Sequence, residues 1–205
     1  MALSAIAALL SLGAIGCQEF ERPSFNRREG ANDAPLLVVP FREPSRHLWY
    51  GESPRGNRLA EHLKRWAREN ALSPVILEGD DVTVTLERVR DWTQGDLRTE
   101  DWKRLTTGLG ARFVVEGEIQ EPKLRSERVV GLYDAELTAK FRVLDVVNGR
   151  VAFESTAQGK YGGGEASLDM ITDVPDRRND AAVEERLLRA LAEQIGKELY
   201  GSYVD

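Results

Sequence analysis

The single cysteine of this 205-residue chain, Cys17, stands directly after the uncharged run from Ala2 to Gly16. A thiol at this place could act as a nucleophile, pack in the core or serve as a site of covalent attachment. Nucleophilic use needs a stabilised thiolate, and the acidic flank that begins at Gln18 offers no such stabilisation. With one cysteine, no disulfide can form within the chain. The sequence therefore favours attachment, with burial as the alternative.

The residues before Cys17 indicate how it would be attached. The apolar run has the length of a secretory hydrophobic region and is shorter than the roughly 20 residues that a spanning helix needs. Gly13-Ala14-Ile15-Gly16 places small residues before a cleavage point. The pattern resembles the bacterial lipoprotein signal, in which the cysteine is lipidated and becomes the first residue of the mature chain. The alternatives are an ordinary secretory peptide and a buried amino-terminal helix with an inert thiol.

The lipoprotein resemblance implies a location and a domain plan. Acyl chains on Cys17 would hold the protein at a membrane, because each buried CH₂ contributes about 0.8 kcal/mol. Gln18 stands where an Asp would retain a lipoprotein in the inner membrane, so the resemblance implies the periplasmic side of the outer membrane. We expect a signal peptide over 1–16, a flexible tether over 17–35 and a single globular domain over 36–205.

Other residues that could carry chemistry lack the necessary neighbours. His47 and His62 have no further Cys or His at ligand spacing, so no metal site is predicted. The glycines at 162–164 lack the lysine and hydroxyl of a phosphate-binding loop. Ser53 is no nucleophile elbow, because position 55 is Arg instead of the required glycine, and we expect it to cap a helix. No cofactor is predicted.

Acidic residues are numerous, but the sequence brings no pair of them into a cleft. Asp80-Asp81 is interpreted as a turn, Glu116 and Glu118 as a solvated strand face, and Glu184-Glu185 as the solvated side of a helix. General acid-base catalysis needs two carboxyl groups with pKa values pushed apart, so no enzyme is predicted. The net charge of −6 argues against a nucleic-acid partner and against docking of the domain to an anionic bilayer.

One loop has the composition of a contact surface. Arg46, Trp49 and Tyr50 follow the first predicted strand, and Arg with large aromatics is typical of binding hot spots. We predict that these three residues contact a partner. The alternative is that the aromatic side chains fold back onto the core.

The first half of the domain predicts two strands and two helices. The apolar run 36–39 predicts a strand that is covered on both faces and central in the sheet. Ser53 and Pro54 predict the start of a helix that runs to about Asn70. Alternating apolar residues predict a second strand over 75–89, and a short helix capped by Thr99 follows, ending at Gly108 or Gly110.

The second half predicts an antiparallel meander and a long helix. Residues 111–120 and 133–143 have strand character, and Asn148-Gly149 predicts a type I′ hairpin turn with positive φ at both residues. The returning strand, 150–160, should place Val151, Phe153, Ser155 and Ala157 on one face. A helix should run from Asp180 to about Tyr203. The fold class is α/β (α+β), a mixed sheet of about five strands packed by three helices.

Several of these segments together resemble a known group of proteins. They are Val39-Pro40-Phe41, the strand 110–119 (GARFVVEGEI) and the hairpin 142–151 (RVLDVVNGRV). With the lipoprotein cysteine, they resemble the bacterial envelope lipoproteins around CsgG, LpoB and the amino-terminal domain of TolB. The similarity spans most of the chain from Leu36 to Tyr200.

This resemblance implies a function without catalysis. It implies a lipid-anchored envelope protein whose periplasmic domain binds other proteins, alone or as an oligomer, in assembly, secretion or regulation of an envelope machine. A pore would need membrane-crossing strand pairs, and the segment 133–160 is explained equally well by the domain's own sheet. The alternative function is a secreted ligand-binding domain or hydrolase that uses the loop 42–53 as part of a pocket.

Overall fold

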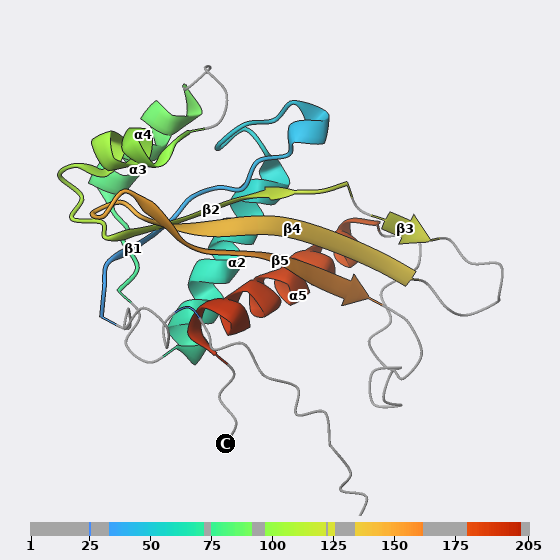
Figure 1. The fold of residues 1–205 in the computed structure, drawn as a ribbon. Helices are drawn as coiled ribbons and strands as arrows, with labels where there is room; N and C mark the ends of the chain where they lie inside the picture. Colours follow the sequence, from blue (N-terminus) through green and yellow to red (C-terminus); the bar gives the residue numbers. More distant parts are fainter. Residues whose placement is uncertain are drawn as a thin grey trace, which may run out of the picture.

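The computed structural model describes residues 25, 33–71, 75–91, 97–121, 123–125, 134–161 and 180–201. In Figure 1 a mixed β-sheet lies between two pairs of helices. The predicted α+β class is confirmed, with four α-helices in the described residues instead of three. Cys17 and the predicted signal peptide lie outside these residues.

The strands are β1 (Leu36–Val38), β2 (Phe113–Ile119), β3 (Lys123–Arg125), β4 (Asp134–Asp145) and β5 (Arg150–Tyr161). The helices are the 3₁₀ turn η1 (Pro44–Arg46), α2 (Pro54–Asn70), α3 (Asp80–Arg90), α4 (Thr99–Thr106) and α5 (Asp180–Tyr200).

The five strands make a sheet that is four strands wide. β2 pairs with residues 139–145 of β4 and β3 with residues 134–136, while β5 pairs along the opposite edge of β4. β1 runs parallel to β2, and β2, β4 and β5 are antiparallel in chain order. The predicted meander is confirmed. The prediction that the first strand is central is wrong, because β1 lies beside β2 alone and its other side carries only the isolated bridge from Leu36 to Ile76.

The sheet has a hydrophobic core on each face. Helices α2 and α5 cover one face, where Leu36 and Val38 are buried, and α3 and α4 cover the other, where Leu37 and Val39 are buried. The side-chain alternation of β1 thus supplies both cores, as its continuous apolar run predicted. Phe25 also packs into the first core, with 2% of its surface exposed.

Helices α2 and α5 form where the sequence predicts them. The Ser53 hydroxyl accepts a hydrogen bond from the Gly56 N–H at 2.8 Å, which confirms Ser53 as the N-cap of α2. In α5, apolar residues at positions three and four apart point into the core. The buried apolar residues are Val183, Leu187, Leu188, Leu191, Ala192, Ile195 and Leu199.

The segment 80–90 is helix α3, and the strand predicted over 75–89 is wrong. The most buried positions are Thr85 and Val89, with Val82 and Leu86 half-buried, a spacing of three and four residues that belongs to a helix. Asp80 and Asp81 lie in the first turn, where carboxylates complement the helix dipole, so they are not a turn as interpreted.

Three local predictions also need correction. The N-cap of α4 is Arg98, whose backbone N–H donates to Asp101, so Thr99 is the first helical residue. The β4–β5 connection is a four-residue turn in which only Gly149 has positive φ, so it is not type I′. The register shift in β5 leaves Ala152 without an opposite residue, which turns Val151 away from the face of Phe153 and leaves it 44% exposed.

Candidate functional site

The loop between β1 and α2 closes into a tight hairpin. Glu43 and Leu48 exchange two backbone hydrogen bonds, with N···O distances of 2.8 and 3.1 Å. His47, at φ 56°, is the one non-glycine residue with positive φ in the described residues, and this left-handed conformation closes the turn after η1. Backbone pairing therefore fixes the path of the loop that presents Arg46 and Trp49.

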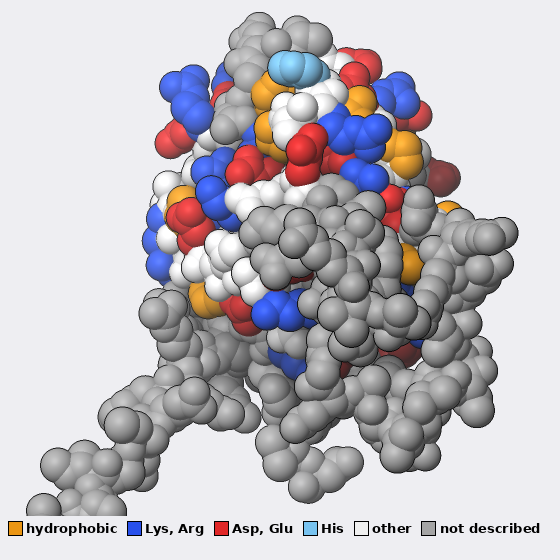
Figure 2. Space-filling model, turned by 90° about the vertical axis from the view of Figure 1, so that its right-hand side faces the viewer, with side chains coloured by type: hydrophobic (Ala, Val, Ile, Leu, Met, Phe, Trp, Pro, Cys, Tyr) orange, Lys and Arg blue, Asp and Glu red, His pale blue; other side chains and the backbone are white. Residues whose placement is uncertain are grey.

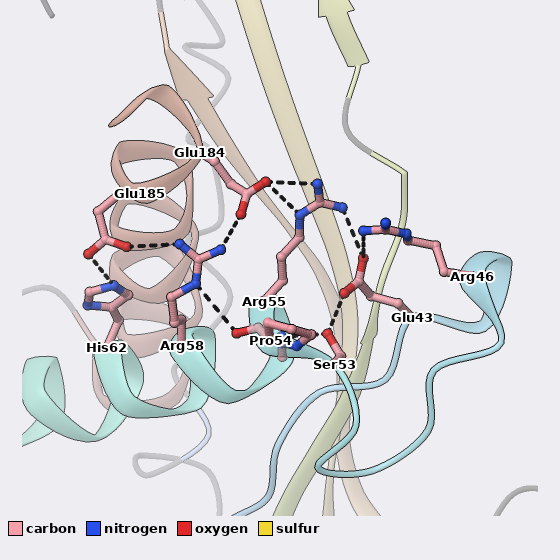
Figure 3. A network of polar contacts seen from close by, with 10 residues as sticks. Glu43, Arg46, Ser53, Pro54, Arg55, Arg58, His62, Glu184 and Glu185 are labelled. Atoms are coloured by element: carbon pink, nitrogen blue, oxygen red, sulfur yellow. Dashed lines mark hydrogen bonds and ion pairs between the residues drawn. The ribbon is translucent and has the colours of Figure 1, made fainter. Parts of the chain in front are cut away.

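The carboxylate of Glu43 fastens this loop to the start of α2. Glu43 is buried, and its side chain accepts hydrogen bonds from the Ser53 hydroxyl and from Arg55 Nη1, the latter at 3.0 Å (Figure 3). Arg46 Nη1 lies 3.8 Å from the same carboxylate. Because a buried carboxylate without partners is strongly unfavourable, these contacts hold the loop and the helix cap together.

The same network continues from α2 to the start of α5. Arg55 Nε donates to Glu184 at 2.8 Å, and Arg58 forms ion pairs with both Glu184 and Glu185 (Figure 3). His62 Nε2 lies 2.9 Å from Glu185 Oε1, without hydrogen-bond geometry. The two helix starts and the loop are thus joined by alternating charges, and Glu184-Glu185 is not merely a solvated helix side as interpreted.

The electrostatics of Glu184 follow from its arginine neighbours. Burial alone would raise the pKa of this carboxyl, but hydrogen bonds and positive charge from Arg55 and Arg58 outweigh burial and lower it. The folded protein therefore holds Glu184 ionised at a pH where the unfolded chain begins to take up a proton.

Glu184→Gln is expected to reduce the acid sensitivity of folding. The pKa of Glu184 is lower in the folded than in the unfolded state. Its contribution to the free energy of unfolding is therefore fully present above the unfolded pKa of about 4.3 and is lost as the pH falls through the folded pKa. Urea unfolding at a series of pH values below about 5 measures how steeply the free energy of unfolding falls with pH. The matched control is Glu193→Gln, on the exposed side of the same helix. Equal slopes for wild type and both variants would contradict the expectation.

The three predicted contact residues differ in exposure. Arg46 is exposed, and the half-buried Trp49 ring lies 5.9 Å from the Arg42 guanidinium. Figure 2 shows hydrophobic side chains beside a histidine at the top of the view, with side chains of both charges around them. Tyr50 is 1% exposed, so it belongs to the core, and its prediction as a contact residue is corrected. For Tyr50 the alternative, an aromatic folding back onto the core, holds.

Tyr50 belongs instead to a buried node around Glu116. The Tyr50 hydroxyl and Trp102 Nε1 donate to Glu116 Oε2 at 2.5 and 3.0 Å, and Arg142 Nε donates to Oε1 at 2.5 Å. Burial, followed by the negative charge of Glu116, raises the pKa of Tyr50 far above its usual value. The interpretation of Glu116 as part of a solvated strand face is wrong, because α4 and the loop cover this part of the sheet.

Several residues of the site were not singled out from the sequence. Arg55 and Arg58 gain their roles through a partner distant in the chain, since Glu184 is 129 positions from Arg55, while Glu43 binds residues up to 12 positions away. No local spacing signals such a pair. The glycines at 162–164 lie outside the described residues. Within the described ranges, no group of three or more metal-ligating side chains is found, and no helix is long and apolar enough to cross a membrane.

Comparison with known proteins finds similarity in solved structures alone. No protein-family model matches the sequence, and no curated protein matches it. The hypothetical protein CT253 from Chlamydia trachomatis is 14% identical, with 82% of this chain and 93% of that chain covered and a TM-score of 0.46. The lipoprotein GNA1162 from Neisseria meningitidis is 19% identical, with 67% and 89% covered and a TM-score of 0.44. The LpoB C-terminal domain from Salmonella enterica is 14% identical, with 62% and 82% covered and a TM-score of 0.39.

Proposed function

We propose that this chain is a lipid-anchored protein of the bacterial envelope whose folded domain binds other proteins. The anchor is an acylated Cys17, supported by the apolar run and the small residues directly before it. Gln18 supports the outer membrane, with the domain on the periplasmic side. In this proposal the stretch between Cys17 and the buried Phe25 connects the lipid to the domain.

The observation that carries the binding role is the loop 42–53, which the fold holds rigid from both sides. Glu43 is tied to α2 through Ser53 and Arg55, and Tyr50 is tied to Glu116. Between these two fixed points the loop exposes Arg46 and part of Trp49. A preorganised loop loses little conformational entropy on binding, and Arg and Trp are enriched at binding hot spots. The loop therefore has the properties of a protein-recognition surface.

The proposal assigns no catalytic residue. Each carboxylate buried in the described residues is accounted for by the fold: Glu43 and Glu116 as above, Asp101 by the Arg98 backbone N–H at 3.1 Å, and Asp145 by the Asn148 N–H at 3.0 Å. A buried carboxylate that already accepts such bonds serves the fold. These groups support a structural role for the buried charges and a contact role for the loop.

Photo-crosslinking in intact cells tests the proposal. A photoreactive phenylalanine analogue at position 49 is expected to join the chain to a partner protein, whereas the same analogue at Lys103, exposed on α4, is not. Arg46→Glu should weaken the position-49 product by about tenfold or more, because loss of a hot-spot arginine costs about 2 kcal/mol. Thermal unfolding of each variant confirms that the fold is retained.

The anchor is tested in the same cells. Cys17→Ser is expected to move the chain from the membrane fraction to the soluble fraction, and mass spectrometry of the wild-type chain should find acyl groups on Cys17. A wild-type chain without acyl groups would refute the anchor. Equal crosslinking at positions 49 and 103, or a product that Arg46→Glu leaves unchanged, would refute the recognition loop.

A further inference from the structure

The domain has two distinct ends, set by the direction of its elements. Arg42 bridges to Glu118 near the far end of β2, five residues beyond Phe113, or about 17 Å along the strand. Helices α2 and α5 both begin beside the loop 42–53, where Arg55 meets Glu184, and both end where Trp66 meets Tyr200. In Figure 1 the β4–β5 turn lies at the left end of the strands, whereas the loop 42–53 lies above the middle of β4, nearer the other end of β2.

Phe25 packs at the end opposite the loop. Its ring meets the ring of Phe113, the first residue of β2, edge to face at a centroid distance of 5.0 Å, and lies 6.1 Å from Phe153. Phe25 is only eight positions after Cys17. Eight residues span at most about 28 Å when fully extended. A buried Phe25 therefore limits how far this end of the domain can stand from an acyl chain on Cys17.

Three of the four large hydrophobic side chains that the described residues expose lie at this same end. Val147 is 59% exposed in the β4–β5 turn, Val151 is 44% exposed at the start of β5, and Val75 is 40% exposed beside β1. Backbone pairing links the segments that carry them across this end of the sheet: the N–H groups of Leu36, Arg112 and Val146 donate to the carbonyls of Val75, Pro35 and Arg112, and Arg150 at the start of β5 pairs with Asp145. At about 4.8 Å per strand spacing, this row of segments is about 20 Å long.

The charges of this row suit a phospholipid surface. Arg112 and Arg150 are exposed, and each guanidinium can donate to lipid phosphate. Asp145 is 1% exposed, is bonded to Asn148 and lies 3.9 Å from Arg150 Nη2, and Asp33 is exposed near Pro35. This local arrangement differs from the net charge of −6, which argued against bilayer docking, because the row is apolar with cations beside it.

We infer that Val75, Arg112, Val147 and Val151 form a membrane-facing surface that rests on the phospholipid bilayer holding the acyl chains. The inference rests on the proposed acylation of Cys17. Phe25 fixes the chain to this end of the domain, so the short stretch from Cys17 brings this end to the lipid. The recognition loop, at the other end, then faces away from the bilayer, toward partners.

Depth-dependent fluorescence quenching tests this surface on the acylated full chain. Cys17 is blocked by its lipid, so Val147→Cys and, as the matched control, Arg46→Cys each supply one free thiol for a bimane label. The proteins are bound to vesicles of phosphatidylethanolamine and phosphatidylglycerol that carry a nitroxide-labelled lipid. Quenching of the label at position 147 should be at least about three times as strong as quenching of the label at position 46, because quenching requires approach to the headgroups. Both positions are exposed, so both variants should fold.

The outcomes separate the surface from the anchor. Equal quenching at both positions, or stronger quenching at 46, on a chain shown by mass spectrometry to be acylated would overturn the surface and leave the anchor intact. A chain without acyl groups would overturn both. Phe25→Ser should narrow the difference between the two labels if Phe25 sets the orientation, and an unchanged difference would overturn that role.

Discussion

Replacing Arg142 with methionine is expected to lower the free energy of unfolding by about 3 kcal/mol. The change leaves the carboxylate of Glu116, which is 1% exposed, without its one cationic partner at hydrogen-bond distance among the described residues. The neutral donors of Tyr50 and Trp102 remain, so the loss stays at the lower end of the range for a broken buried ion pair. Arg142 also donates to the Leu97 carbonyl at 3.0 Å, a bond that the methionine loses too. Urea unfolding at pH 7 measures the effect.

The control for this prediction, Glu118, lies two residues after Glu116 in β2. Glu118 is half-exposed, with Arg42 3.9 Å away, so Glu118→Gln should cost no more than about 0.5 kcal/mol. The double variant Glu116→Gln with Arg142→Met should be less destabilised than the sum of the single variants, by about 1 kcal/mol or more. Strict additivity would mean that Arg142 acts by packing and not through Glu116.

The hydrogen bonds around Glu116 and the ion-pair network around Glu43 and Glu184 both hold the loop 42–53 in place. Tyr50, at the end of the recognition loop, is held by Glu116, and Glu43, near its start, is held by Ser53 and Arg55. The loop therefore depends on both sheet and helices for its shape. Variants at Glu116 should consequently alter partner binding even though Glu116 cannot touch a partner.

Much of the fold could be predicted because periodicity reports local structure directly. The alternation in 134–145 and the four-residue spacing in 180–200 are both long enough to exclude other structures. Helix α3 was missed because its β-branched residues, Val82 to Thr85, favour strands locally. Packing against α4 and the sheet, with Val89 and Trp102 in one core, favours the helix over the local strand preference.

The site was less predictable, because burial on one face of a strand depends on what covers that face. Glu116 and Glu118 are two residues apart and so lie on the same face of β2, yet α4 covers Glu116 and leaves Glu118 half-exposed. Tyr50 and Trp49 are adjacent aromatic residues, and the hydrogen bond to Glu116 decides which one is buried. Such assignments depend on contacts between distant segments.

Replacing Gly56 with alanine is expected to lower the free energy of unfolding by about 3 kcal/mol or more. A Cβ atom at this position would lie 1.8 Å from the carbonyl oxygen of Phe41 and 2.7 Å from its carbonyl carbon. Both are backbone atoms, so no side-chain rotation can relieve the clash. The first turn of α2 would have to move away from Phe41, although the Phe41 N–H is bonded to the Gly56 carbonyl at 3.3 Å.

The same displacement should disturb the recognition loop, because Ser53 and Arg55 lie in or beside that first turn and hold Glu43. We therefore expect Gly56→Ala to weaken partner crosslinking from position 49 as well as stability. The matched control is Gly149→Ala, where a Cβ meets nothing within 4 Å but φ is 67°. Its cost should be about 1 to 2 kcal/mol, from the left-handed backbone alone. A loss of stability for Gly56→Ala no larger than that for Gly149→Ala would contradict the expected size of the clash with Phe41, and unchanged crosslinking from position 49 would contradict its effect on the loop.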